Sequence, residues 1–187
     1  WILCGAKFAD LFCLFTVIVH IVPHGIDIGL TLPTAALVLA TIGGTSIAGR
    51  LTIGTAFDKF GAKRSLLTCF TLLLCSLLLI QVAEQTWMVF VFATIYGLAH
   101  GGFFTVTSPS VAEFFGTRSH GAIFGSVVLC GTIGGTLGPF VTGRIFDASG
   151  SYDSAFIVLT GFSVVGLLIA SRLQPIAPPS SRIWEET

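Results

Sequence analysis

Six apolar stretches follow one another along the chain, separated by short polar links. They lie at residues 3–23, 33–54, 65–83, 87–107, 121–145 and 154–172. A stretch of about 20 apolar residues is long enough to cross a bilayer as an α-helix. Because the links are short, neighbouring helices should run antiparallel. The pattern predicts an all-α integral membrane protein, with a six-transmembrane-helix bundle over residues 1–173 and a proline-rich, flexible tail over 174–187.

Basic residues gather in the links on one side of this zigzag. They are Lys7, Lys59, Lys63, Arg64, Arg118, Arg172 and Arg182. The other side holds mostly acids, with Arg144 as its one cation. Cytoplasmic loops of membrane proteins collect Lys and Arg. The bias predicts that both ends of the chain lie in the cytoplasm, in a plasma membrane or a bacterial inner membrane.

Composition excludes several classes of protein. Apolar residues make up 53% of the chain and charged residues 10%, with a net charge of zero, whereas soluble domains carry about 25% charged residues. A neutral chain without a basic stripe gives no reason to expect a nucleic-acid partner. The five cysteines form no C-x-x-C pair, and neither H-E-x-x-H nor G-x-S-x-G occurs. We therefore expect no metal site, no cofactor and no enzyme activity.

The link between the second and third stretches carries a dense motif over residues 54–64. Its members are Gly54, Asp58, Lys59, Gly61, Lys63 and Arg64. This segment resembles the loop signature of the major facilitator superfamily of secondary transporters. The resemblance implies a twelve-helix fold, of which this chain would be the C-terminal half and a missing N-terminal six-helix half the remainder. It also implies a gating role for Asp58, Lys59, Gly61 and Arg64.

Asp58 is the acid of this motif. A carboxylate at the cytoplasmic end of the second stretch can face the N-terminus of a neighbouring helix, whose free N–H groups attract negative charge. The fifth stretch begins at the same level, near Ser119, and would be the partner of such a latch. The alternative is a solvated loop whose cations, Lys63 and Arg64 above all, only fix the topology.

Arg50 lies inside the second stretch, about one helical turn before Gly54. An arginine in hydrocarbon is costly, so it should face a watery cavity or a partner. Its guanidinium can bind a carboxylate with two parallel hydrogen bonds. Alternatively, it reaches the headgroups from near the end of the span. Position alone leaves both interpretations open.

Two segments resemble the monocarboxylate transporter family in particular. Residues 45–54 resemble its eighth helix, in which an arginine binds the substrate carboxylate. Residues 138–152 match G-P-x-x-x-G-R-[IL]-x-D-x-x-G-x-Y, the pattern of its eleventh helix and following loop. The resemblance covers almost the whole chain. It implies a symporter that carries a small organic anion, a monocarboxylate, together with a proton, with Arg50 as the anion site.

The chain departs from this family at two places. Ser46 stands where animal members carry an aspartate implicated in proton coupling, and the fifth stretch lacks the lysine of oxalate/formate antiporters, with Gly131 near that place. Other carriers therefore stay open: an exchanger, or a carrier of a sugar or drug. A non-transporting membrane sensor is the rival from another class. The glycine and proline content of the second and fifth stretches argues against such a rigid receptor.

Further candidates lie in the outer half of the first stretch. His20, His24 and Asp27 share one helical face if Pro23 does not break the helix. They suit a proton relay or an outer gate, a metal site, or interfacial polar positions without a special role.

Other pairs share helical spacing. Tyr96 and His100, four residues apart, either line the cavity as substrate contacts or pack as aromatic residues. Lys7 and Asp10, three apart, form either an interfacial ion pair or part of a coupling site.

Gly138 and Pro139 are expected to kink the fifth stretch and to serve gating. Glu113 and Arg118 either join Asp58 in a charge network or lie in a solvated loop.

Overall fold

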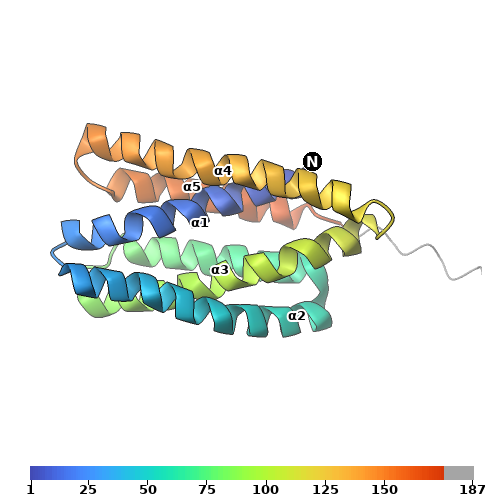
Figure 1. Ribbon diagram of the computed structural model, residues 1–187, viewed down its shortest axis with the longest axis horizontal. Helices are drawn as coiled ribbons and strands as arrows, with labels where there is room; N and C mark the ends of the chain where they lie inside the picture. The colour runs from blue at the N-terminus through green and yellow to red at the C-terminus, as the bar shows by residue number, and fades with distance from the viewer. Residues whose placement is uncertain (175–187) are drawn as a thin grey trace, which may run out of the picture.

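The fold is a bundle of long helices. The computed structural model describes residues 1–174, so the expected tail lies outside the described residues except for Gln174. Within this part the helices are α1 (Ile2–Asp27), α2 (Leu32–Ile80), α3 (Thr86–Phe115), α4 (His120–Ser149) and α5 (Asp153–Ser171) (Figure 1). Residues 1–174 contain no strand. The prediction of an all-α fold is confirmed.

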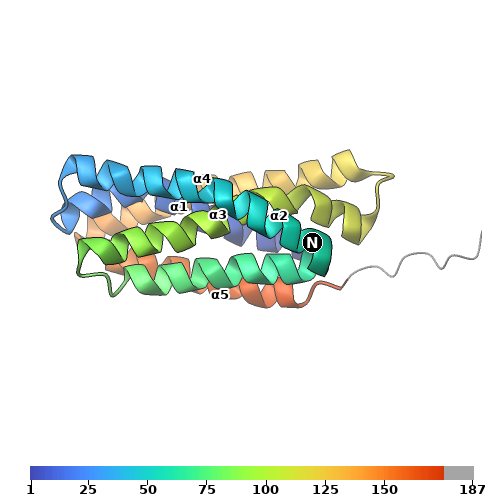
Figure 2. The ribbon, with the colours of Figure 1, turned by 90° about the horizontal axis from the view of Figure 1, so that it is seen from below.

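The second helix differs from expectation. α2 comprises 49 residues, more than twice the about 20 that cross a bilayer once. Gly61 has φ 77° and ψ 178°, which is not helical. It divides α2 into two limbs, residues 32–60 and 62–80, that run in opposite directions (Figure 1), and Figure 2 shows α3 between them. The exact count of six separate helices is not confirmed, because only one residue, Gly61, interrupts α2 where a whole link was expected.

Local chemistry explains where the helices begin and end. The Thr31 side chain accepts a hydrogen bond from the Thr34 N–H (3.4 Å), and Pro33 occupies the first turn of α2. Gly150 ends α4 in the left-handed conformation, at φ 69°. Pro23 lies inside α1 without ending it, since α1 continues to Asp27.

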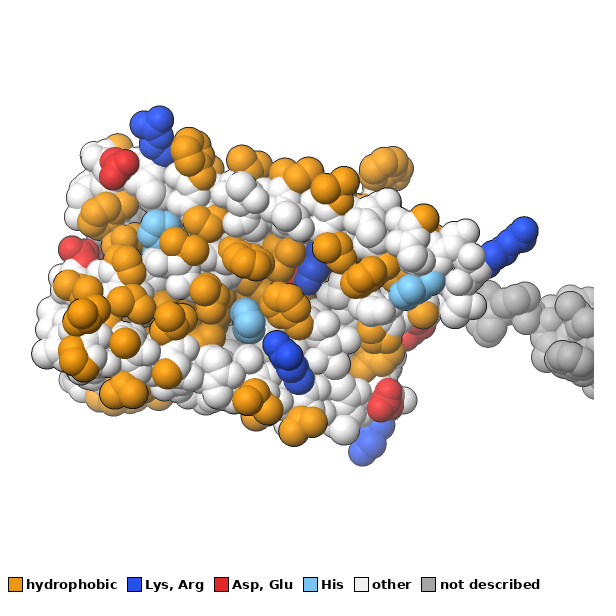
Figure 3. Space-filling model, viewed as in Figure 1, with side chains coloured by type: hydrophobic (Ala, Val, Ile, Leu, Met, Phe, Trp, Pro, Cys, Tyr) orange, Lys and Arg blue, Asp and Glu red, His pale blue; other side chains and the backbone are white. Residues whose placement is uncertain are grey.

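The helices lie roughly along the long axis of the molecule and connect at its two ends (Figure 2). Phe70, Phe92, Tyr96 and Phe103 are fully buried between them. Large apolar side chains also cover the outside (Figure 3); Leu51, for example, is 69% exposed. All five helices are long and apolar enough to cross a membrane. Such an outer surface fits lipid, and the integral membrane assignment is supported.

Glycines bring α2 and α3 into backbone contact. A Cβ added at Gly49 would overlap the Leu98 carbonyl, and one at Gly101 would overlap the Ser46 carbonyl. At Gly97 an added Cβ would overlap the Thr45 hydroxyl. Small residues at a crossing allow this approach.

A second glycine contact joins α1 and α4. Cβ atoms added at Gly134 and Gly138 would overlap the carbonyl oxygens of Phe8 and Phe12. In both helix pairs, α2–α3 and α1–α4, the glycines therefore allow the two backbones to touch.

Candidate functional site

The candidate site is organised around one aromatic ring. Arg50 Cζ on α2 lies 6.0 Å from the centre of the Phe104 ring on α3, and Lys7 Nζ on α1 lies 5.4 Å from it. The His100 ring, one turn before Phe104, is 5.1 Å away. Three helices thus bring two cations and an imidazole to one phenyl ring, at distances typical of cation–π contacts. Figure 3 shows cationic and histidine side chains amid hydrophobic ones in the middle of the face viewed.

Arg50 lies at the α2–α3 crossing and is exposed. A Cβ at Gly101 would lie 3.0 Å from the Arg50 backbone nitrogen, so the glycine contact fixes the base of this side chain. Among residues 1–174 the only ion pair is Lys7–Asp10. The guanidinium of Arg50 is therefore an unneutralised charge that can receive an anion.

An apolar cavity opens beside Phe104. It has a volume of about 290 Å³ and lies between α1, α3 and α4. The side chains that line it are those of Leu11, Phe15, Phe104, Val128, Thr132 and Thr136, with Gly135. The Thr132 hydroxyl donates to the Val128 carbonyl (2.9 Å) and that of Thr136 to the Thr132 carbonyl (2.9 Å). Because both hydroxyls are occupied, the wall offers mainly apolar contact.

Lys7 and Asp10 form a buried ion pair. Lys7 Nζ donates to Asp10 Oδ2 at 2.5 Å, and the two side chains are only 8% and 1% exposed. The expectation of an ion pair is confirmed, but not its interfacial position. The second oxygen, Asp10 Oδ1, is buried without a hydrogen-bond partner.

Tyr96 and His100 have different surroundings. Tyr96 is fully buried, and its hydroxyl donates to the Leu14 carbonyl at 2.7 Å. Its place favours the packing alternative, and its role as a substrate contact stays a prediction. His100 is half-buried beside Phe104, and its Nδ1 atom has no hydrogen-bond partner. Of Tyr96 and His100, only His100 shares the Phe104 ring with Arg50.

At the opposite end of α1, His20 joins three helices. Its Nε2 atom is 3.1 Å from the Pro139 carbonyl of α4, and Nδ1 is 3.4 Å from the Tyr152 hydroxyl before α5. A carbonyl only accepts, so Nε2 is the donor, and in neutral His20 the Nδ1 atom accepts from Tyr152. Burial raises the pKa of Tyr152, with smaller contributions from Asp27 and Asp147, which keeps this hydroxyl protonated.

His24 and Asp27 have different surroundings from those of His20. The His24 ring packs edge-on against Tyr152 (5.5 Å) and Phe156 (4.8 Å), while Asp27 is exposed. Over residues 1–174 no three His, Cys, Asp or Glu side chains gather as metal ligands do. Both histidines, His20 and His24, contact Tyr152.

The loop motif surrounds the break in α2. Asp58, Lys59 and Arg64 are exposed, and none has an ion-pair partner among the described residues. The latch from Asp58 to the start of the fifth expected span, now α4, is not formed in this structure. The Glu113 carboxylate of α3 instead accepts from the Ala62 N–H at 2.8 Å, at the start of the second limb of α2.

Gly61 is required at this break. Its φ of 77° favours glycine, and an added Cβ would lie 3.1 Å from Glu113 Oε1. The two residues therefore hold the turn together, Gly61 by its conformation and Glu113 by its hydrogen bond.

The kink motif in α4 is packed rather than free. Gly138 lies against the backbone of α1, as described above, and the Pro139 carbonyl is bonded by His20. Pro139 lies inside α4 without ending it.

Sequence reasoning missed Phe104 and Tyr152 as members of these clusters. Phe104 follows His100 by four residues, so helical spacing alone would have placed it on the same face. Tyr152 ends the second segment that resembles the monocarboxylate transporters, but nothing in the sequence pairs it with His20.

Comparison with known proteins places the chain in a family. The sequence profile of the Major Facilitator Superfamily matches residues 3–183. Monocarboxylate transporter 12 of Homo sapiens is 28% identical over 152 residues, 79% of this chain and 29% of that protein. Monocarboxylate transporter 13 of Rattus norvegicus is 30% identical over 150 residues, covering 79% and 35%.

Monocarboxylate transporter 11 of Homo sapiens is 28% identical over 179 residues, 89% of this chain and 37% of that protein. The chain thus spans about a third of the length of the curated relatives that it matches. The match to the superfamily covers nearly every residue, and the apolar helical bundle agrees with it. The chain belongs to the Major Facilitator Superfamily, a family of membrane transporters rather than of enzymes.

Proposed function

We propose that this chain is the C-terminal half of a secondary transporter that carries small monocarboxylates together with protons. The observation that carries the proposal is the unneutralised guanidinium of Arg50, which lies 6.0 Å from the ring of Phe104, a side chain that lines an apolar cavity of about 290 Å³. A monocarboxylate has the matching parts, one anionic end and one apolar end. The names of the relatives, monocarboxylate transporters 11, 12 and 13, point to the same class of substrate.

In this proposal the carboxylate binds Arg50 through two parallel hydrogen bonds. Phe104 and His100 border the anion, and the body of the substrate lies against the apolar wall that includes Leu11 and Phe15. A missing N-terminal half supplies the opposite wall. Rocking of one half against the other exposes the site to each side of the membrane in turn.

The gating elements are the break in α2 and the kink in α4. Asp58, Lys59 and Arg64 stand exposed around Gly61, where they are free to contact the other half. At the far end His20 bonds the carbonyl of Pro139 in α4. By the charge bias, the end that holds Gly61, Trp1 and Gln174 is cytoplasmic, in a plasma membrane or a bacterial inner membrane.

Proton transfer at the outer end is assigned to His20, His24 and Asp27. Both histidines contact Tyr152, so His20 and His24 share one side chain at this end of α1.

Exchange without net proton movement is the second candidate function. The observation that favours it is Ser46, which lacks the acid of animal members and whose hydroxyl donates to the Gly43 carbonyl at 3.0 Å. An exchanger would swap labelled for unlabelled substrate but would not respond to a pH gradient.

The test is uptake of labelled pyruvate by the full-length protein in liposomes under an inward proton gradient. We expect uptake that Arg50→Ala abolishes and that Leu51→Ala leaves unchanged, since Leu51 is 69% exposed on the apolar surface. Uptake that survives Arg50→Ala would make the arginine structural. A folded protein that takes up neither pyruvate nor lactate would refute the substrate class.

A further inference from the structure

The Lys7–Asp10 pair lies inside the bundle rather than at its rim. Its charges meet at 2.5 Å, and the Asp10 side chain is 1% exposed. Ionisable residues within membrane helices are rare and usually mark a pathway for ions or substrate. A pair spaced three residues apart on a helix surface adds little stability, and burial of two charges costs desolvation. Stability alone therefore does not account for this pair.

The Lys7–Asp10 pair lies next to the proposed anion site at Arg50, because Lys7 and Arg50 approach the same aromatic ring. Lys7 Nζ lies 5.4 Å from the centre of the Phe104 ring, which Arg50 approaches at 6.0 Å. Lys7 is also in contact with α4, because a Cβ at Gly131 would lie 2.8 Å from Lys7 Cγ. The ammonium group thus stands between a buried carboxylate and the place assigned to the substrate anion.

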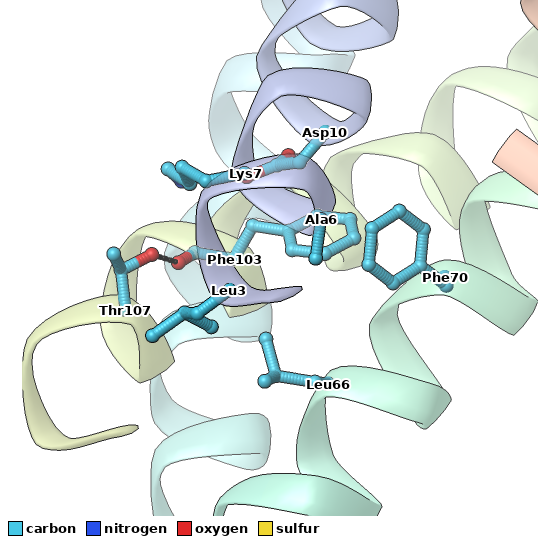
Figure 4. A pocket seen from close by; sticks show the side chains of 8 residues that line it. All are labelled: Leu3, Ala6, Lys7, Asp10, Leu66, Phe70, Phe103 and Thr107. Carbon is cyan, nitrogen blue, oxygen red and sulfur yellow. Dashed lines mark hydrogen bonds and ion pairs between the residues drawn. The ribbon is translucent and has the colours of Figure 1, made fainter. Parts of the chain in front are cut away.

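Asp10 has an oxygen that nothing in the protein satisfies. Its Oδ1 atom is buried and unpartnered, although Oδ2 is bonded to Lys7. Asp10 also lines a cavity of about 10 Å³, close to the least volume that holds one water. Figure 4 shows Lys7 and Asp10 above the rings of Phe103 and Phe70 in this cavity. The Thr107 hydroxyl in the same lining donates to the Phe103 carbonyl and offers Oδ1 no proton.

The groups that can affect the charge of Asp10 are few. Besides Lys7 itself, the titratable groups of the described residues that interact with the pair are Cys13 on α1, Cys69 on α2, and Tyr96 and His100 on α3. No other carboxylate is among them. Asp10 is therefore the one acid of this region that can take a proton and become neutral.

We propose that Asp10 carries the coupling proton and that Lys7 switches between Asp10 and the substrate carboxylate. The inference rests on the proposed function. With the site empty, Lys7 neutralises Asp10. A proton from water then adds to a carboxylate oxygen of Asp10, the ion pair breaks, and the ammonium turns toward the substrate anion beside Arg50. Release reverses both steps. One proton and one monovalent anion cross together, so the cycle moves no net charge.

In this proposal Asp10 takes the role of the aspartate that animal members carry at the position of Ser46. The protonatable group lies on α1 instead of α2, but it still acts on the same anion site through Lys7. His20 and His24 lie at the other end of α1 and would pass protons without holding the one that is carried.

The test compares two assays in liposomes that contain the full-length protein and labelled pyruvate. The first measures accumulation under an inward gradient of one pH unit, which one proton per anion converts into about tenfold accumulation. The second measures exchange at equal pH, which needs no net proton transfer. The variants are Asp10→Asn, the double variant Lys7→Met with Asp10→Leu, and the matched control Glu84→Gln, whose carboxylate is exposed near the α2–α3 link.

We expect wild type and Glu84→Gln to accumulate pyruvate, and Asp10→Asn to exchange it without accumulation. The double variant removes both charges at once, so it leaves no unpaired charge in the bundle and keeps the test informative if Asp10→Asn does not fold. It should fold, and it should also fail to accumulate pyruvate. Accumulation by either variant at the wild-type level would overturn the inference and leave the proposed function intact. A wild type that neither accumulates nor exchanges pyruvate or lactate would overturn both.

Discussion

Gly101→Ala provides a stringent test of the α2–α3 contact. The added Cβ would overlap the Ser46 carbonyl oxygen, and it would lie 2.8 Å from the Ser46 carbonyl carbon and 3.0 Å from the Arg50 backbone nitrogen. Carbon atoms attract at about 3.5 Å or more, so the two backbones must separate by at least about 0.7 Å, and by more to clear the carbonyl oxygen. Neither neighbour is a flexible side-chain end that can turn away. The helices themselves have to move.

The cost follows from this displacement. Overpacking of a well-packed interior costs about 1–3 kcal/mol, and each kcal/mol lowers the melting temperature by about 2–4 °C in a domain of this size. The effect on transport should be larger, because Arg50 moves with its backbone, and a misplacement of about 1 Å can cost about a hundredfold in rate. We expect a melting temperature lower by several degrees and a tenfold or greater loss of pyruvate uptake.

Gly43→Ala is the matched control, since it lies on α2 and nothing is within 4 Å of its added Cβ. Alanine is the better helix former there, by about 1 kcal/mol. The melting temperature of the purified protein and uptake in liposomes measure both effects. If Gly101→Ala were as stable and as active as Gly43→Ala, the close contact and the reasoning from it would be refuted.

Three further changes test other contacts. Glu113→Ala removes the acceptor for the Ala62 N–H and should cost about 1 kcal/mol, as loss of a helix cap does; Glu113→Gln, which keeps an oxygen, should cost less in the same thermal melt. Gly61→Ala should cost about 1–3 kcal/mol because φ 77° with ψ 178° is a conformation that essentially only glycine adopts, and equal stability would contradict that conformation. Tyr96→Phe leaves the Leu14 carbonyl without its hydrogen bond, so stability should fall by about 1 kcal/mol, with KM for pyruvate unchanged; a several-fold rise in KM would show that Tyr96 contacts substrate.

The apolar stretches located the helices well because bilayer thickness fixes their length. Four of the six expected stretches lie entirely inside one helix; the stretch 65–83 overruns α2 by three residues and the stretch 154–172 overruns α5 by one. The pattern could not show that the link between the second and third stretches is almost entirely helical. Residues 54–60 include Gly54, Asp58 and Lys59 yet continue α2 as helix up to Gly61. Likewise α3 continues through Pro109 to Phe115.

The candidate site was visible only in part. Arg50 stands out because a cation in an apolar stretch has few explanations. Phe104 does not, because the chain has 17 phenylalanines and spacing alone does not say which one meets two cations. The Lys7–Asp10 pair shows the opposite case. Its spacing predicted the contact, but the burial of both side chains depends on α3 and α4 packing over α1, which no local pattern contains.

The one-residue break in α2 has a consequence for how the chain enters the membrane. Because only Gly61 separates the two limbs, no free loop remains to let one limb insert while the other waits. The limbs from Leu32 to Ile80 would enter as a single hairpin unit, with their closed end held by Glu113 once α3 has been synthesised. Epitope tags and protease sites should then be tolerated in the links around Glu84 or Arg118 but not at Gly61, where any inserted residue would force the hairpin open.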